Sequence, residues 1–331
     1  MRILPLLLLA MLGGAAEPLR LVASVPDLGD LAREVGGDAV VVTVLARGDE
    51  DPHTVELRPA FISALAQADV LLEMGLDYDT HWINAALVQN PRPSLLRLKA
   101  HEAVTLIKPP VEDDGHGHGH GHGHDHGHQH AAGNPHFLCD PVAAAQVCLA
   151  LGHILGLQRP DDANALRQRG EAAALRLARA LVGPAACDRL GTPVVLKAMA
   201  AGDPTPLIGS DLGGWLGRTA ALRGLPLIAD HDGWPYLARR FDLAIVGFLE
   251  PSPGVPSSTA HLGKVVALGK GAGVRAVIIS PWSDPRQADT VSKALNVPTL
   301  VLAPQSAALP NAPDYHAAVE WNISTLERLA R

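Results

Sequence analysis

The stretch RPDDANALRQRGEAAALRLARALVGP, residues 159–184, decides how the rest of the chain is organised. Asp161 and Asp162 stand near its start, arginines gather toward its end, and Gly183-Pro184 closes it. This order of charges complements the dipole of a helix, and the alanines and leucines between them have high helix propensity. The stretch therefore predicts one long helix of about 20 residues.

The half of the chain before this helix alternates short apolar runs with helical patterns. Helices are expected at 27–37 and 58–68, where the spacing of apolar residues is helical. Such alternation predicts a mostly parallel sheet that is covered by helices on both faces. The β-branched and apolar runs that read as strands are 19–25, 39–48, 69–75 and 94–99.

The half after the long helix repeats this alternation. Its expected strands are 225–230, 243–249, 274–280 and 298–303, with helical patterns between them and after the last. The segment 191–224 is compatible with an extra strand and helix, but no pattern places it. The chain is thus predicted to be an α/β protein of two lobes joined by one long, rigid helix. The predicted lobes are residues 17–158 and 185–331, and the linking helix is 159–184.

The first 16 residues have the pattern of a cleaved export signal. Arg2 is followed by an apolar run at 3–12 and by the small residues Gly14-Ala15-Ala16. The run is about half of the ~20 residues that a membrane-spanning helix needs. We therefore expect an exported, periplasmic protein whose mature chain starts near Glu17.

The composition excludes some classes of partner and leaves the cysteines open. The net charge is −7 and only 4% of residues are aromatic, so neither a basic field nor stacking platforms favour nucleic acid. Cys139, Cys148 and Cys187 are an odd number, so at least one is unpaired in a monomer. A bridge between Cys148 and Cys187 is compatible with an oxidising compartment, and the sequence does not decide it.

The run DDGHGHGHGHGHDHGHQH, residues 113–130, attracts attention first. Glycine at alternate positions denies it a core and a stable helix, so a mobile surface loop is expected. Each metal site formed there must lose chain entropy on binding, which predicts weak accessory sites. Their ligands would be His116, His118, His120, His122, His124, His126, His128 and His130.

Three other histidines lie beside expected strand ends or helix starts. His53 follows the second strand, His136 precedes a helix, and His231 stands at the carboxyl end of a strand of the second half. Ligands of open α/β sheets bind beyond the carboxyl ends of strands, so a site between the lobes would gather all three. Neutral imidazole suits Zn²⁺ in tetrahedral geometry, whereas Mn²⁺ prefers oxygen.

Three motifs around these histidines carry a family resemblance: DPHTVELRPA (51–60), NPHFLCDP (134–141) and ADHDGWPYLARRFDL (229–243). Together they resemble the zinc/manganese solute-binding proteins of ABC transporters, the ZnuA-like (cluster A-I) family, many members of which carry a His-rich loop. The resemblance implies a monomer that captures periplasmic Zn²⁺ between its lobes and delivers it to a membrane permease. Mn²⁺ is the less favoured cargo, and a zinc metallochaperone is a further partner left open.

The fourth ligand is where this sequence departs from the family. Ala303-Pro304 and Ser280-Pro281 stand where many members have Asp-Pro and Glu-Pro. The remaining candidates are water, Glu50 or Asp51 beside the first histidine, and Asp284, with water or Glu50 preferred. Cys139, three residues after His136, could bind zinc as a thiolate, but a buried structural role is preferred.

Other function classes stay open at this stage. A periplasmic zinc buffer or metallochaperone, or a manganese-binding homologue, would use the same ligands. An exported zinc hydrolase would need a general base near the metal, commonly within an H-E-x-x-H motif, and the chain has none. We therefore expect no enzymatic activity.

Overall fold

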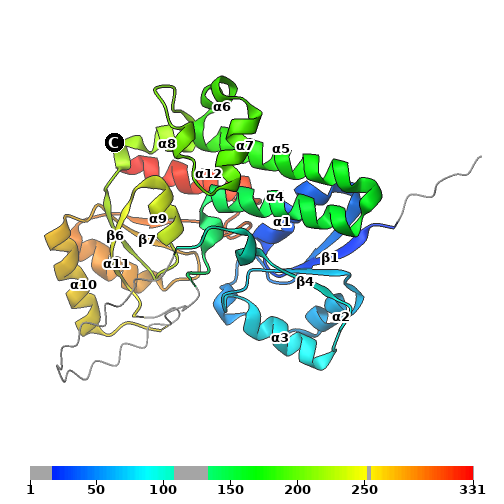
Figure 1. The fold of residues 1–331 in the computed structure, drawn as a ribbon. Coiled ribbons are helices and arrows are strands. Elements are labelled where there is room, and N and C mark those ends of the chain that lie inside the picture. Colours follow the sequence, from blue (N-terminus) through cyan, green and yellow to red (C-terminus); the bar gives the residue numbers. More distant parts are fainter. Residues whose placement is uncertain (1–16, 108–132, 252–254, 331) are drawn as a thin grey trace, which may run out of the picture.

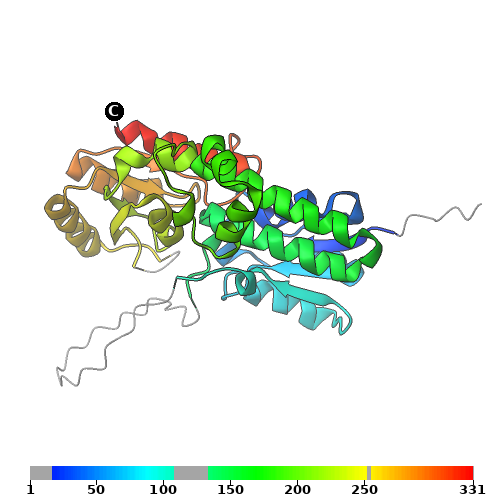
Figure 2. The ribbon, with the colours of Figure 1, turned by 45° about the horizontal axis from the view of Figure 1, so that its top comes forward.

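The structure, a computed structural model, describes residues 17–107, 133–251 and 255–330. The predicted signal peptide and the whole of the run 113–130 lie outside these residues. Figures 1 and 2 show two α/β lobes side by side, with a layer of helices along one side of both. The elements before the second sheet are β1 (Leu19–Ala23), α1 (Pro26–Gly36), β2 (Val40–Val44), α2 (Pro59–Gln67), β3 (Val70–Glu73), α3 (Thr80–Gln89), β4 (Leu96–Lys99), α4 (Pro141–Gln158), α5 (Ala163–Val182), α6 (Pro184–Leu190), α7 (Thr192–Ala200) and α8 (Gly214–Arg218).

The second sheet and its helices complete the chain. They are β5 (Pro226–Ala229), α9 (Pro235–Phe241), β6 (Ala244–Phe248), α10 (Thr259–Ala272), β7 (Ala276–Ile279), α11 (Pro285–Leu295), β8 (Thr299–Val301) and α12 (Tyr315–Leu326). The strand orders are β2-β1-β3-β4 and β6-β5-β7-β8, and neighbouring strands are parallel throughout. The predicted α/β class with two parallel sheets is confirmed, and the two sheets share one topology.

The predicted long helix is α5, and it does not stand free between the lobes. It ends where Gly183 adopts a positive φ of 91°, and Pro184 then begins α6 at once. It packs along α4 so closely that a side chain on Gly170 would collide with the Cys148 carbonyl carbon and oxygen. Both views show the two helices side by side over the first lobe, and α5 continues to α8 beside the second.

The segment 191–224, unplaced by the sequence pattern, contains no strand. It forms α7, α8 and two short 3-10 turns. In α7, Val195, Ala198 and Met199 are buried, a spacing of three and four residues that points one apolar stripe at the protein. This helical periodicity, with a proline in the first turn, outweighs the strand propensity of the adjacent valines.

One hydrophobic core runs through both lobes. It contains Leu21 and Leu71 of the first sheet together with Leu227 and Ile278 of the second. The last helix strengthens this link, because Tyr315 donates its hydroxyl hydrogen to the carbonyl of Leu138 at 2.7 Å. The strand ends of the two sheets are therefore held facing each other by a shared core.

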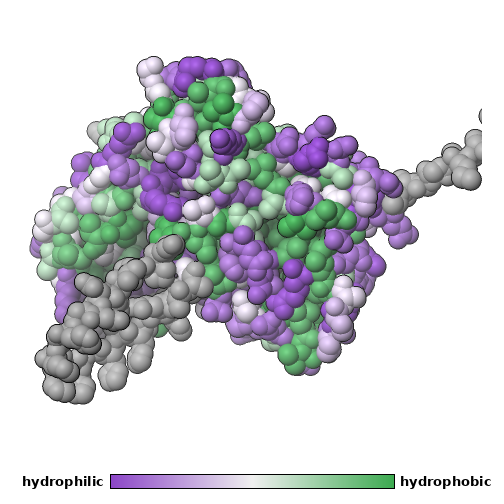
Figure 3. Space-filling view, viewed as in Figure 1, coloured by the Kyte–Doolittle hydropathy of each residue, from purple (hydrophilic) through white to green (hydrophobic). Residues whose placement is uncertain are grey.

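Helix α4 has the length and apolar composition of a membrane span, but 67% of it is buried inside the protein, as in a core helix. The exposed large apolar side chains of the described residues are scattered over both lobes. Figure 3 shows the same on one face, where apolar areas are separated by polar ones. These residues are Val41, Leu57, Val88, Leu157, Val194, Ile208, Val255, Leu268 and Val301.

Candidate metal centre

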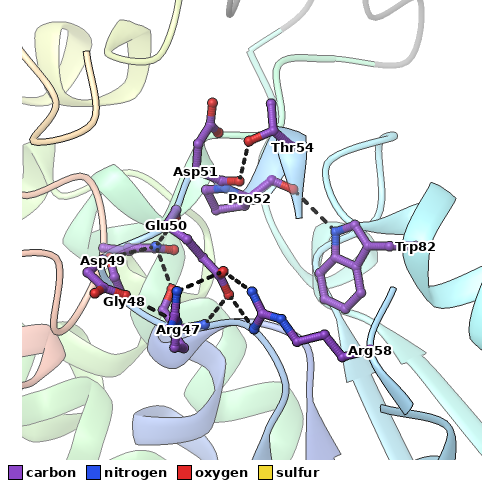
Figure 4. Close-up of polar contacts among 10 residues, drawn as sticks. Arg47, Gly48, Asp49, Glu50, Asp51, Pro52, Thr54, Arg58 and Trp82 are labelled. Atoms are coloured by element: carbon purple, nitrogen blue, oxygen red, sulfur yellow. Dashed lines mark hydrogen bonds and ion pairs between the residues drawn. The ribbon is translucent and has the colours of Figure 1, made fainter. Parts of the chain in front are cut away.

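His53 is presented by the long loop that follows β2. It lies in a 3-10 turn, Pro52–Thr54, whose cap is Asp51: the carboxylate accepts the His53 backbone N–H at 2.9 Å. Trp82 in α3 donates its indole N–H to the carbonyl of Pro52 at 3.2 Å (Figure 4). The turn is thus fixed from both sides, which directs the imidazole away from its own sheet toward the other lobe.

His136 stands just before α4 and is oriented by Asn134. The Asn134 side-chain oxygen accepts the His136 backbone N–H at 3.0 Å and lies 3.0 Å from the ring Nδ1. If Nδ1 carries the proton, Nε2 is left as the metal-binding atom. The Tyr236 hydroxyl accepts the Ile107 N–H and donates to the Asn134 carbonyl, so the second lobe holds both chain segments that flank residues 108–132.

His231 follows β5 and is held by the buried carboxylate of Asp230. His231 Nδ1 lies 3.3 Å from Asp230 Oδ1. The same carboxylate accepts the N–H of Ser280 and the hydroxyl of Ser283, at 2.6 and 2.7 Å, and the indole N–H of Trp234. A side chain at Gly233 would come within 2.8 Å of His231 Nε2, so glycine there leaves room for the imidazole ring.

The charge of Asp230 favours positive charge on or beside the His231 ring. Burial alone would raise the pKa of Asp230, but hydrogen bonding and charge from His231 and the two serines hold it well below its usual range. Burial would lower the pKa of His231, but the Asp230 carboxylate outweighs burial and raises it. A carboxylate that remains ionised behind an imidazole fixes the ring tautomer and increases its basicity as a ligand.

The three imidazoles meet between the lobes. Their candidate ligand nitrogens all lie within 4.8 Å of one another, and the Nε2 atoms of His53 and His136 are 3.0 Å apart. Two nitrogens on a tetrahedral zinc ion are about 3.3 Å apart at the usual Zn–N distance of ~2.0–2.1 Å. His136 and His231 are 7% and 8% exposed, and His231 Nε2 is buried without a hydrogen-bond partner among the described residues. This arrangement suits a cation.

The space around the imidazoles is small. A cavity of about 10 Å³ is lined by the three histidines with Asp51, Tyr78 and other residues. The ring of Tyr78 packs edge-on against His53 and His136, with centroid distances of 4.9 and 5.3 Å. This volume is close to the smallest that holds one water, so it suits a bare ion with one small extra ligand.

Two of the three carboxylates proposed as fourth ligands, Glu50 and Asp284, bind arginines and lie outside this cluster. Glu50 binds the Arg58 guanidinium and accepts the Arg47 N–H at 2.7 Å, and Figure 4 shows its side chain directed to these partners. These bonds lower its pKa against the effect of burial. Asp284 caps α11 and pairs with Arg286 at 3.0 Å. Of the described residues, only the three histidines form such a cluster.

Asp51 and Cys139 are nearer to the site. Asp51 lines the cavity, and burial raises its pKa, opposed by the His53 N–H and by His231. Cys139 is buried, its pKa is strongly raised by burial, and its thiol faces the carbonyls of Gly233 and Pro304 at 3.8 Å. Its sulfur is not among the ligand atoms that meet at the three histidines, so we do not assign it as a ligand. All three cysteines are free, so the bridge between Cys148 and Cys187 is not formed.

The residues that orient the histidines, Asn134 and Asp230, were not predicted from the sequence. Asn134 and Asp230 are each within two positions of a ligand histidine, and this adjacency was the one available signal. A short polar residue beside a histidine is common in any loop, so the signal is weak. Histidines outside the cluster make local contacts: His101 and His261 lie 3.1 Å from backbone carbonyls. The eight histidines of 116–130 lie outside the described residues.

Two parallel sheets that face each other across a group of candidate ligand side chains are the architecture of a two-lobed binding protein. The chain matches the family described as "Zinc-uptake complex component A periplasmic" (ZnuA) over residues 21–180 and 213–329. It therefore belongs to the ZnuA family of periplasmic solute-binding components of ABC transporters, which are not enzymes. The unmatched residues 181–212 include α6 and α7.

Individual relatives are more distant. The chain is 35% identical over 86 residues to the high-affinity zinc uptake system protein ZnuA of Paracoccus denitrificans, which covers 24% of this chain and about a quarter (26%) of that protein. A crystal structure of ZnuA is 18% identical with a TM-score of 0.66, over 95% of this chain and 96% of that chain. FpvC from Pseudomonas aeruginosa in complex with Mn²⁺ is 19% identical with a TM-score of 0.70, over 95% and 98%. A Cd-bound protein from Candidatus Liberibacter asiaticus is 14% identical with a TM-score of 0.69, over 95% and 100%. These structures share the fold.

Proposed function

We propose that this protein captures periplasmic Zn²⁺ with His53, His136 and His231 and delivers it to an ABC permease for uptake. The observation that carries the proposal is the convergence of three candidate ligand nitrogens within 4.8 Å, two from the first lobe and one from the second. Because both lobes contribute, binding and lobe position are coupled. A permease that separates the lobes would lower the affinity for the ion.

The donor set supports zinc over manganese. Three imidazoles match the preference of Zn²⁺ for nitrogen in tetrahedral geometry, whereas Mn²⁺ prefers carboxylate and carbonyl oxygens. The fold alone does not discriminate, since similar structures are described with Mn²⁺ and with Cd. We assign the fourth coordination position to a water molecule, for which the small cavity has room. The Asp51 carboxylate lines this cavity.

The proposal also assigns a role to each segment of the chain. Residues 1–16 act as a cleaved signal, 17–158 and 185–331 form the lobes, 159–184 links them, and the mature protein is a monomer. The run 113–130 binds further zinc ions weakly and passes them to His136. The contact of Tyr236 with Ile107 and Asn134 supports this handover, since it holds both flanks of that segment beside the site.

The proposal is tested by titrating zinc against a chelator of known affinity, in a chain from which residues 115–130 are deleted. We expect one tight site, and each change His53→Ala, His136→Ala or His231→Ala should weaken it more than about 100-fold. Loss of a supporting residue alone costs about 10-fold to 100-fold, and loss of a ligand should exceed that. His153→Ala, an exposed histidine of α4, is the matched control.

Tight 1:1 binding that survives all three substitutions would overturn the assignment of the site. Uptake is then separated from buffering by growth in zinc-poor medium, with and without the permease. If the protein supports growth equally in both strains, it stores zinc rather than delivering it. Manganese titration of the same variants tests the choice of cargo.

A further inference from the structure

The loop that joins β8 to α12 reaches across from the second lobe to the loop that carries His53. It is anchored in its own lobe by Asn322, whose side-chain amide bonds both the N–H and the carbonyl of Ala303, at 2.7 and 2.8 Å. The next residue, Pro304, lines the cavity at the three histidines. The loop supplies no ligand, yet it lies against the site.

Gln305 makes the central contact of this loop. Its side-chain nitrogen lies 3.0 Å from the carbonyl oxygen of Gly48, 3.1 Å from that of Glu50 and 3.4 Å from that of Arg47. Gln305 is 2% exposed, and its Oε1 atom has no partner among the described residues. Three carbonyl oxygens around one amide group require the NH₂ end there, because the oxygen would repel all three.

The backbones of the two loops also touch. A side chain at Gly48 would come within 2.4 Å of the Ser306 carbonyl oxygen, so only glycine allows this approach. Ser306 then bonds Asp27 of α1 through both its N–H and its hydroxyl, each at 2.6 Å. The His53 loop is therefore pressed between its own lobe and the loop 303–308 of the other.

We propose that Gln305 is a positioning residue for the metal centre: from the second lobe it holds the His53 loop in the binding geometry without touching the ion. The carbonyls that it bonds lie between three and six residues before His53, in the segment that sets the direction of the turn at Pro52–Thr54. When the lobes move apart, this amide leaves the loop, His53 loses its position, and the affinity for the ion falls. This inference rests on the proposed function.

Gln305→Glu tests the proposal, because it replaces the amide NH₂ group with a carboxylate oxygen that repels the three carbonyls. The side chain keeps nearly the same shape. We expect zinc affinity to fall about 10-fold to 100-fold, as it does when residues that orient ligands are changed. Backbone amides of residues 48–53 should exchange hydrogen faster in the metal-free variant. Gln305→Leu, which removes the donor without adding charge, should show the same direction. Gln168→Glu, the same change at an exposed position of α5, should show neither effect.

A double-mutant cycle separates positioning from general damage to the fold. In a His53→Ala background the loop no longer supplies a ligand, so Gln305→Glu should weaken binding less than about twofold further. An equal loss in both backgrounds would overturn the proposal, as would an unchanged affinity of the single variant. If the chain without these substitutions lacks a tight zinc site, the proposed function itself is wrong, and the two failures are thus distinguishable.

Discussion

The two lobes share a sheet topology but use their loops differently. The first lobe presents two histidines of the candidate site from loops far apart in the sequence, His53 after β2 and His136 before α4. The second presents one, His231, two residues after β5. In the first lobe the neutral amide of Asn134 lies against the His136 ring, and the Asp51 carboxylate accepts the backbone N–H of His53. In the second, one buried carboxylate, Asp230, contacts the His231 ring and accepts hydrogen bonds from two serines and a tryptophan.

This difference shows that the sheet determines where the loops lie, whereas the residues in the loops determine what can bind there. Parallel strands direct their carboxyl ends, and hence their loops, to one edge, whatever residues the loops contain. The strands β1 and β5 occupy the same place in their sheets, yet one is followed by Asp27 and the other by His231. Three predictions, in order of decreasing effect, test this difference between the lobes.

The largest effect is expected at the contact between the lobes. Burial, opposed by the bonds from Ser306, raises the pKa of Asp27 from 3.8 to about 7. A raised pKa favours the protonated carboxyl in the fold, so the stability it contributes is complete below pH 3.8 and lost as pH rises through 7. Asp27→Asn stays uncharged, and at pH 8 the metal-free variant should be more stable by up to about 4 kcal/mol.

Urea unfolding at pH 4 and pH 8 measures this prediction. At pH 4 the variant and the parent should have nearly the same free energy of unfolding, and the difference should open between the two values of pH. Asp38→Asn, at an exposed position close by in the sequence, should show no such opening. A difference independent of pH would mean that Asp27 is ionised at both values.

A smaller effect, on zinc affinity, should distinguish a histidine oriented by a carboxylate from one oriented by a neutral amide. Asp230→Asn removes the charge behind His231 and should weaken zinc binding about 10-fold to 100-fold. Asn134→Ala removes a neutral partner of His136 and should cost less than about tenfold, because hydrogen bonds to charged groups are the stronger ones. Chelator competition on both variants gives the ratio. Equal losses would show that the charge of Asp230 is unimportant to the ligand.

The smallest effect on the tight site should come from the segment with most histidines. Deletion of residues 115–130 should lower the number of zinc ions bound per chain, while the affinity of the tight site changes less than about twofold. Calorimetric titration of both chains measures the two quantities together. Loss of the tight site on deletion would make the run, rather than the three separate histidines, the centre of binding.

Much of this architecture could be predicted from local pattern. The charges and the glycine around residues 163–182 were enough to predict the long helix. The positions of His53, His136 and His231 beside strand ends, together with the family resemblance of the motifs around them, predicted the shared site in which they meet. The segment 191–224 could not be placed, because the paired valines at 194 and 195 favour a strand locally. The residues that become buried there, Val195, Ala198 and Met199, are instead spaced as on one face of a helix. The spacing of apolar residues distinguishes a helix from a strand only when the surface against which the segment packs is known.

Long-range contacts explain the remaining gaps. Glu50 beside His53 resembled a ligand, and nothing in the sequence indicates that Arg58 binds its carboxylate. The bond of Ser306 to Asp27 joins residues 279 positions apart, and Gln305 meets Gly48 across 257. Such pairs depend on the packing of both lobes, which no window of sequence contains.

These distant bonds also determine when the binding geometry can first exist. The loop that holds His53 is synthesised early, whereas Gln305 and Ser306, which lie against it, are synthesised much later. The same holds for Tyr315, which bonds Asp30 of α1 at a separation of 285 residues. Contacts of such separation form late in folding, since the intervening chain must be ordered first. We therefore expect the candidate metal centre to be among the last parts to be completed, and a partly folded chain to lack the tight zinc site that we propose.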